Sequence, residues 1–335
     1  MNSDRPLTRK IGLTSLVLLG GLVISVAMAV AWGTTGGSLR AIWEALQSGT
    51  GAGGAQQTIL WRIRLPRALL AAELGATLSL GGLVFQALLR NALAEPYILG
   101  ISGGAAVGAI LGIMLGLARY PGVAGLAFTG SLAIMGLVLY LASGRQLLRK
   151  DSLLLAGVMV NAFCSAVILF LISLSQDFRL HQIMFWLMGD LSLADMGQVG
   201  RLAIILAPCF FALFLLSHAM NLLTMGTETA QALGLHVKTI MVLLLMVTSL
   251  MISASVAHCG LVGFVGLVMP HVLRLVLGPD HRVLVPACLF GGGAYLVLCD
   301  LTARVISRQG EMPVGVVTAM IGAPVFIYLL RRTRN

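Results

Sequence analysis

Long apolar stretches alternate with short polar connections along the whole chain. A helix needs about 20 apolar residues to cross the hydrocarbon core of a bilayer. The pattern therefore predicts an all-α, polytopic membrane protein with about ten transmembrane helices, built as a single domain over residues 1–335. The predicted spans lie near residues 11–32, 68–89, 97–117, 122–142, 152–175, 202–220, 239–257, 259–274, 283–300 and 313–330.

Two segments depart from this simple pattern. The short span at 259–274 contains GLVGFVGLVMPH (260–271), whose glycines and Pro270 indicate a broken helix or a hairpin. Such interruptions are tolerated where they pack against protein or line a cavity. The apolar run IMFWLMG (183–189) is too short to span and predicts an interfacial helix, with Trp186 at the depth of the headgroups.

Composition strengthens the membrane interpretation. Hydrophobic residues make up 58% of the chain and charged residues only 10%, against about 25% charged in soluble domains. The mean hydropathy is +0.97. Forty glycines are typical of membrane helices that approach one another closely. The five cysteines are isolated within apolar segments, which predicts buried free thiols rather than disulfides or a metal site.

The charge of +10 is scattered between apolar spans, which argues against nucleic-acid binding. An even number of spans places both termini on one side. That side carries all three lysines and the larger number of arginines, so both termini, including a short tail at 1–10, are predicted to be cytoplasmic. Arg62, Arg64 and Arg67 then crowd into one outer loop, which indicates an acidic external partner. The first apolar stretch is too long for a signal peptide and is predicted to be retained.

Motifs for catalysis are missing from the sequence. A P-loop requires Gly-Lys-Ser/Thr, but none of the three lysines (Lys10, Lys150 and Lys238) follows a glycine. We therefore expect no enzymatic activity and no cofactor in this chain. The remaining classes are a pore, a carrier, or the membrane half of a machine powered by another subunit.

The segment LLTMGTETAQALGLHVK (222–238) predicts a short polar helix in an inner loop. Thr227 is expected to cap it through its hydroxyl, and Glu228 suits its first turn. Gly234 is well placed to end it. The segment is either a plain connector or a knob that docks into a cytoplasmic partner.

The inner loop RNALAEPYILG (90–100) is tight. Pro96 forces the residue before it out of helical conformation, and Asn91 can hold an Asx turn. The loop is either a turn between helices or a constriction at the cytoplasmic mouth of a path. Lys150 and Asp151 could supply another part of that constriction.

Polar groups within spans are functional candidates by default. Glu73 lies in the second predicted span, and Asn161 in the fifth could face a cavity. Asp300 and Arg304 have the i,i+4 spacing of an ion pair. His258 and His271 flank the broken span and are expected to be packing residues, since no spacing of two histidines suits a metal ion.

Several segments together resemble the permeases of bacterial type II ABC importers, which move ferric siderophores, haem and cobalamin. The resemblance covers nearly the whole chain. Its segments are RLPRALLAAELGATLSLGGLVFQALLRNALAEPYILGISGGAAVGA (64–109), SLLLAGVMVN (152–161), GTETAQALGL (226–235), GFVGLVMPHVLRLVLGPDHR (263–282), CDLTAR (299–304) and EMPVGVVTAMIGAPVFIYLLRR (311–332).

The resemblance implies a multi-pass homodimer in the lipid of the bacterial inner membrane, with a path at the dimer interface. Two separate ATPase subunits, which bind ATP and Mg²⁺, are implied below it, and a periplasmic binding protein above. Segment 226–235 is similar to the coupling helix, with Gly226, Thr227, Glu228, Thr229, Ala230, Leu233 and Gly234 facing the ATPase. Arg64, Arg67 and Arg304 resemble the residues that receive the binding protein, Asn91 and Leu93 a cytoplasmic gate, and Asn161 is expected on the path.

This chain departs from the family pattern at two places in the gate. The family usually reads N-P-L-A-[ED]-P, whereas Ala92 replaces the first proline here. The second gate often carries small hydroxyl residues, whereas Lys150 and Asp151 are charged.

The resulting prediction is the permease subunit of an ATP-driven importer for a bulky metal chelate. The cargo class stays open among siderophore, haem and cobalamin, with an iron chelate favoured as the commonest. An ion-gradient-driven secondary carrier or channel is the alternative. It would need ionisable groups near the bilayer midplane, and only Glu73 qualifies.

Overall fold

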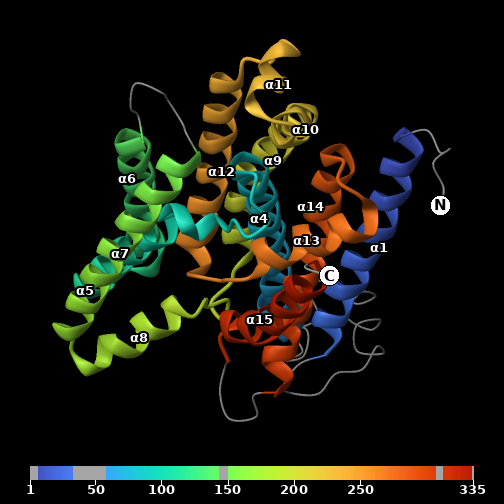
Figure 1. Cartoon of the computed structure of the whole chain (residues 1–335). Coiled ribbons are helices and arrows are strands. Elements are labelled where there is room, and N and C mark those ends of the chain that lie inside the picture. Colours follow the sequence, from blue (N-terminus) through green and yellow to red (C-terminus); the bar gives the residue numbers. More distant parts are fainter. Residues whose placement is uncertain (1–6, 33–57, 143–149, 307–311, 334–335) are drawn as a thin grey trace.

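The computed structural model describes residues 7–32, 58–142, 150–306 and 312–333. These residues form a bundle of helices, with no β-strand in any of the four ranges (Figure 1). The α-helices are α1 (Leu7–Ala31), α4 (Leu65–Leu89), α5 (Ile101–Met114), α6 (Ala124–Ala142), α7 (Lys150–Ser173), α8 (Asp177–Leu187), α9 (Met196–Leu215), α10 (Ser217–Thr224), α11 (Thr227–Ala232), α12 (Val237–Cys259), α13 (Val265–Leu277), α14 (His281–Ile306) and α15 (Val314–Thr333). Short helical turns are η2 (Leu60–Arg64), η3 (Pro96–Leu99) and η4 (Arg119–Val123).

Each of the ten predicted spans corresponds to a helix, in the predicted order. Seven helical segments in the described ranges are long and apolar enough to cross a membrane, and α5, α13 and the part Val314–Tyr328 of α15 are shorter apolar segments. The 14 residues of α5 and the 13 of α13 reach only about 20 Å each. Because the hydrocarbon core is about 30 Å thick, neither helix crosses it alone.

Helix α4 is at the centre of the bundle. In the most apolar window of Leu60–Leu89, 83% of residues are buried, against 11% for α1. Glycines allow its neighbours to come this close. A Cβ atom on Gly82 would lie 1.8 Å from the carbonyl oxygen of Gly266 in α13, and one on Gly75 would lie 2.3 Å from that of Gly292 in α14. The predicted glycine packing is therefore present at backbone contact distance.

The prediction that Arg62, Arg64 and Arg67 lie in an outer loop is wrong. The π-helical turn η2 continues directly into α4, so all three arginines belong to one helical segment that begins before the predicted span. Pro66 has no N–H to donate to the preceding turn, and it follows directly on η2, where the helix has the wider π pattern.

The predicted interruption near residue 260 is confirmed. Helix α12 ends at Cys259 and α13 begins at Val265, with non-helical backbone between them.

Loop 90–100 is hydrogen-bonded to the non-helical backbone between α12 and α13. Glu95 Oε1 accepts a hydrogen bond from Phe264 N at 2.8 Å. The Tyr97 hydroxyl donates to Val262 O at 2.9 Å and accepts from Val262 N at 3.0 Å.

The predicted interfacial helix is confirmed as a helix, α8, which lies at the opposite end of the bundle from α11 (Figure 1). Its end is tied to the interruption after α12. Asp190 N donates to Cys259 O at 2.9 Å, and Leu261 N donates to Trp186 O. Trp186 is buried within the protein.

Candidate functional site

The segment predicted to couple to a partner forms the short helix α11. Its N-cap is Gly226, whose φ of 121° favours glycine, and no side chain caps the helix. The predicted hydroxyl cap is therefore wrong: Thr227 is the first helical residue, so its side chain is one position too late to cap it. Glu228 lies in the first turn, as predicted.

Gly234 ends α11 as predicted. It adopts a φ of 86°, its N–H donates to Gln231 O, and Leu235 N donates to Ala230 O. This pair of bonds is the Schellman arrangement, which satisfies the last carbonyls of a helix. Ala230 is buried against the protein, whereas Leu233 is 59% exposed. Helix α11 lies at one end of the bundle (Figure 1), and the apolar side chain of Leu233 is exposed there.

The candidate gate residues lie on a tight turn after α4. Asn91 Oδ1 accepts a hydrogen bond from Leu93 N at 2.9 Å, which confirms the predicted Asx turn. Glu95 is extended, as expected before Pro96. Leu93 is exposed. The side chains of Lys150 and Asp151, at the start of α7, fall outside the described part of the structure.

Asn161 lies on the face of α7 that packs against α5. Its Oδ1 lies 3.0 Å from the position that a Cβ on Gly103 would occupy. The side chain is half-buried. Its place on a translocation path stays a prediction.

Two of the three candidate docking arginines share one buried carboxylate. Arg67 Nε donates to Asp300 Oδ1 at 2.9 Å, and Arg304 Nε forms an ion pair with Asp300 Oδ2 at 3.0 Å. Asp300 is fully buried. The i,i+4 pair of Asp300 and Arg304 is confirmed. Arg67 lies more than 200 residues from Asp300 in the chain, and no pattern in the sequence indicated that the two side chains are paired.

Arg64 and Arg304 cap the last carbonyls of α1. Arg64 Nη1 donates to Val30 O and Ala31 O, both at 3.1 Å, and Arg304 Nη2 donates to Ala29 O at 3.1 Å. Cations are favourable at a helix C-terminus. Exposed fractions are 7% for Arg64, 5% for Arg67 and 9% for Arg304. We call Arg64, Arg67, Arg304 and Asp300 the arginine cluster. Within this stretch the exposed arginine is Arg62.

A cavity at the α8 end of the bundle was not predicted from the sequence. It has a volume of about 300 Å³ and is lined in part by Arg119, His181, Phe185, Trp186 and Asp190. Arg119 Nη1 pairs with Asp190 Oδ2 at 2.8 Å. Burial alone would raise the pKa of Asp190, but the charge of Arg119 and hydrogen bonds from Ser192 hold that pKa below its usual value.

The other polar candidates include His258, the cysteines and Glu73. His258 Nδ1 contacts Ala254 O, one turn earlier in α12, at 2.8 Å. All five cysteines are buried and free, as predicted. Across the described ranges, no three His, Cys, Asp or Glu side chains are grouped so that they could hold a metal ion. Glu73 Oε2 has no hydrogen-bond partner among the described residues.

Comparisons with known proteins agree on one family. The FecCD transport family matches residues 21–332. The vitamin B12 import system permease protein BtuC of Klebsiella pneumoniae subsp. pneumoniae is 43% identical over 326 residues, which covers 97% of this chain and 93% of the relative. BtuC of Salmonella typhi is also 43% identical, over 83% of this chain and 85% of the relative.

Solved structures agree with this assignment. An inward-facing structure of a metal-chelate type ABC transporter matches with a TM-score of 0.85 at 29% identity, covering 95% of this chain and 98% of the other. PsaBC of Streptococcus pneumoniae, at a TM-score of 0.56 and 16% identity, shares the fold alone. The helical bundle and these relatives show a multi-pass membrane permease that is not itself an enzyme. The chain therefore belongs to the FecCD transport family, as a permease of the type II ABC importer class.

Proposed function

We propose that this chain is the permease subunit of an ATP-driven importer that carries cobalamin or a closely related corrinoid to the cytoplasm. The names of the 43% identical relatives, which match almost the full chain, are the observation that carries this cargo. They favour cobalamin over the siderophore and haem alternatives. The sequence has no nucleotide-binding motif, so ATP and Mg²⁺ belong to a separate ATPase.

The cargo is tested by transport into proteoliposomes that contain this chain, its ATPase and its binding protein. Labelled cyanocobalamin should accumulate only when ATP is present on the ATPase side. Haem and a ferric hydroxamate siderophore serve as competing cargoes in the same vesicles. Transport of either of them in preference to cyanocobalamin would overturn the cargo, and transport without ATP would overturn the energy source.

The arrangement that we infer is a homodimer in the inner membrane, with the α11 end and both termini in the cytoplasm. The path runs between the two copies, with Asn161 beside it. Asn91 and Leu93 close its inner mouth together with Lys150 and Asp151. The exposure of Leu93 and the tight Asx turn support a rigid, accessible rim at this place.

We further propose that α11 docks two copies of the ATPase, one on each subunit. Changing Leu233 to Asp should weaken binding of the ATPase at least about tenfold, the effect of losing about 1.4 kcal/mol. The reason is that an exposed apolar side chain becomes charged at the centre of the contact. Co-purification and surface plasmon resonance with the ATPase measure this.

Phe178 is the matched control for Leu233. It is an exposed apolar residue on α8, at the opposite end of the bundle. Phe178→Asp should leave binding of the ATPase unchanged. Equal loss in both variants would mean that the charge acts on the fold and not on the docking surface.

The binding protein is proposed to dock at the α8 end, over the arginine cluster. Arg64, Arg67 and Arg304 are buried, whereas Arg62 in the same stretch is exposed. The direct contact with the binding protein is therefore assigned to Arg62, with the buried cluster adding positive charge beneath it. Arg62→Glu should weaken docking about tenfold at low ionic strength and much less at 0.5 M salt, since exposed charges are screened.

The matched comparison for docking is Arg64→Gln. It removes a buried guanidinium that caps α1 and should lower thermal stability more than docking affinity. Docking that is insensitive to Arg62→Glu at every salt concentration would place the contact elsewhere.

A further inference from the structure

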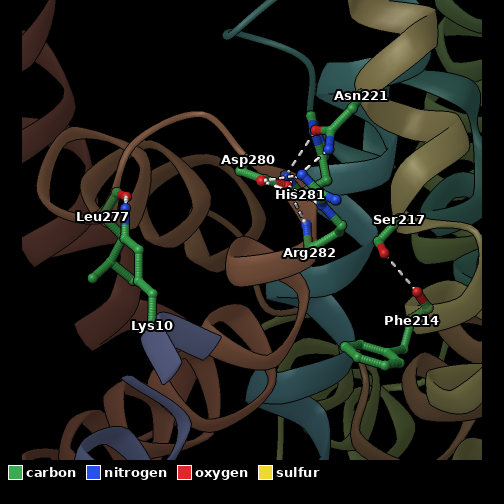
Figure 2. A network of polar contacts seen from close by, with 8 residues as sticks. All are labelled: Lys10, Phe214, Ser217, Asn221, Leu277, Asp280, His281 and Arg282. Atoms are coloured by element: carbon green, nitrogen blue, oxygen red, sulfur yellow. Dashed lines mark hydrogen bonds and ion pairs between the residues drawn. The ribbon is translucent and has the colours of Figure 1, made fainter. Parts of the chain in front are cut away.

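A polar network joins α10 to the turn before α14, and Figure 2 shows its members. Asn221 on α10 makes three polar contacts across this gap. Its Nδ2 donates to Asp280 Oδ1 at 2.8 Å. Its Oδ1 accepts from His281 N at 2.8 Å and lies 2.7 Å from His281 Nδ1. A single amide thus holds two consecutive residues that lie about 60 positions further along the chain.

Asn221 is chemically matched to this place. Asp280 already caps α14 through the N–H of Arg282, at 3.0 Å, so the first N–H of the helix, that of His281, is left for Asn221. Hydrogen bonds from the Arg282 side chain, above all, lower the pKa of Asp280 to about 2. The carboxylate is therefore ionised, and across the gap it accepts a further hydrogen bond from the amide nitrogen of Asn221.

The network is also well buried at its centre. His281 is 2% exposed, and its Nε2 has no partner among the described residues. The contact to the N–H of His281 is costly to break, because this buried group loses its bond without gaining water. By contrast, the ion pair of Arg282 with Asp280 stays within the turn and is partly exposed.

The network lies between α11 and the long helix α14. Only Met225 and Gly226 separate α10 from α11. On the other side of the contact, α14 runs for 26 residues, about 39 Å, to the arginine cluster near its far end. Asn221 therefore links the helix next to α11 with a rigid helix that extends through the bundle, packed along α4 and α1.

We propose that Asn221 is a positioning residue for transport: it transmits displacement of α11 to α14 through Asp280 and His281. This inference rests on the proposed function. The spans α9 and α12 are adjacent to α10 and α11 in sequence and would move with the ATPase. The proposal adds α14 to the helices that move with it. A contiguous polar contact between packed elements is a physical route for such coupling.

The test is the number of ATP molecules hydrolysed per cyanocobalamin transported in the proteoliposomes. Asn221→Asp places a carboxylate against Asp280 and should raise this ratio at least about threefold, within the range of coupling energies between contacting residues. The swap N221D/D280N restores a donor and an acceptor across the gap, with their direction reversed, and should return the ratio toward that of the wild type.

Arg282→Gln is the matched control, because it removes the ion pair within the turn and no contact to α10. A purely structural role predicts equal ratios in all variants, with differences in thermal stability only. That result would overturn the proposal, as would a swap no better than N221D alone. If N221D folds poorly, Asn221→Ala removes the contacts without repulsion and is judged by the same ratio.

Failure of the proposed function itself would look different. The wild-type complex would then fail to bind the ATPase, or would hydrolyse ATP without taking up cyanocobalamin. If the wild type and N221D transported cyanocobalamin with the same number of ATP molecules, only the role of Asn221 would be overturned, and the proposed function would stand.

Discussion

Asp300→Asn is expected to lower the free energy of unfolding of the permease by about 3–5 kcal/mol, the usual cost of removing one partner from a buried ion pair. Asp300 is fully buried and is the carboxylate that Arg67 and Arg304 share. The neutral amide has almost the same shape, so the loss reports charge and not volume. Thermal unfolding in detergent micelles, followed by size-exclusion chromatography of the folded fraction, measures it.

The control for this variant is Asp177→Asn, an exposed acidic residue in the first turn of α8. Its effect should stay within about 0.5 kcal/mol, as for most surface substitutions. If Asp300→Asn were as stable as the wild type, the carboxylate would not be what holds Arg67 and Arg304 in the bundle.

Gly82→Ala should be the most damaging substitution of a small residue. The added Cβ would lie 1.8 Å from Gly266 O and 2.4 Å from Gly266 C, which are backbone atoms of α13 and cannot rotate away. Overpacking costs about 1–3 kcal/mol where side chains can yield, so a clash with backbone should reach or exceed that range. The yield of folded protein and its unfolding temperature should both fall.

Gly125→Ala is the matched control, because no atom lies within 4 Å of the Cβ it would add on α6. There the substitution should be neutral or stabilising by up to about 1 kcal/mol, since alanine favours helix more than glycine does. Similar losses in both variants would contradict the close approach of α4 and α13.

Features governed by local chemistry could be predicted from the sequence. Apolar length was enough to find the ten helices, and Gly234, Asn91 and Pro96 each act on residues within a few positions. The cap at Thr227 was misplaced by a single residue, which periodicity cannot resolve. The helix that contains Arg62, Arg64 and Arg67 begins before the apolar run, so apolar length placed its start too late.

Long-range contacts could not be predicted in this way. Arg64 is hydrogen-bonded to α1, and Arg67 is paired with Asp300. The sequence alone suggested that both arginines were available for docking a partner, because neither internal bond is visible in it. The bonds of Asn221 to His281 and of Glu95 to Phe264 likewise join segments with no shared pattern. Only packing of the whole bundle brings these groups together.

Side-chain hydrogen bonds attach α1 to the rest of the bundle near both of its ends. Near one end Lys10 Nζ donates to Leu277 O at 2.8 Å, and at the other the arginine cluster binds Ala29, Val30 and Ala31. The distance along the helix from Lys10 to Ala31 is about 32 Å, close to the thickness of the hydrocarbon core. The length of α1 therefore fixes the spacing between its two attachments. Inserting one residue would lengthen the helix by about 1.5 Å and rotate one end by about 100°, so that only one attachment would survive.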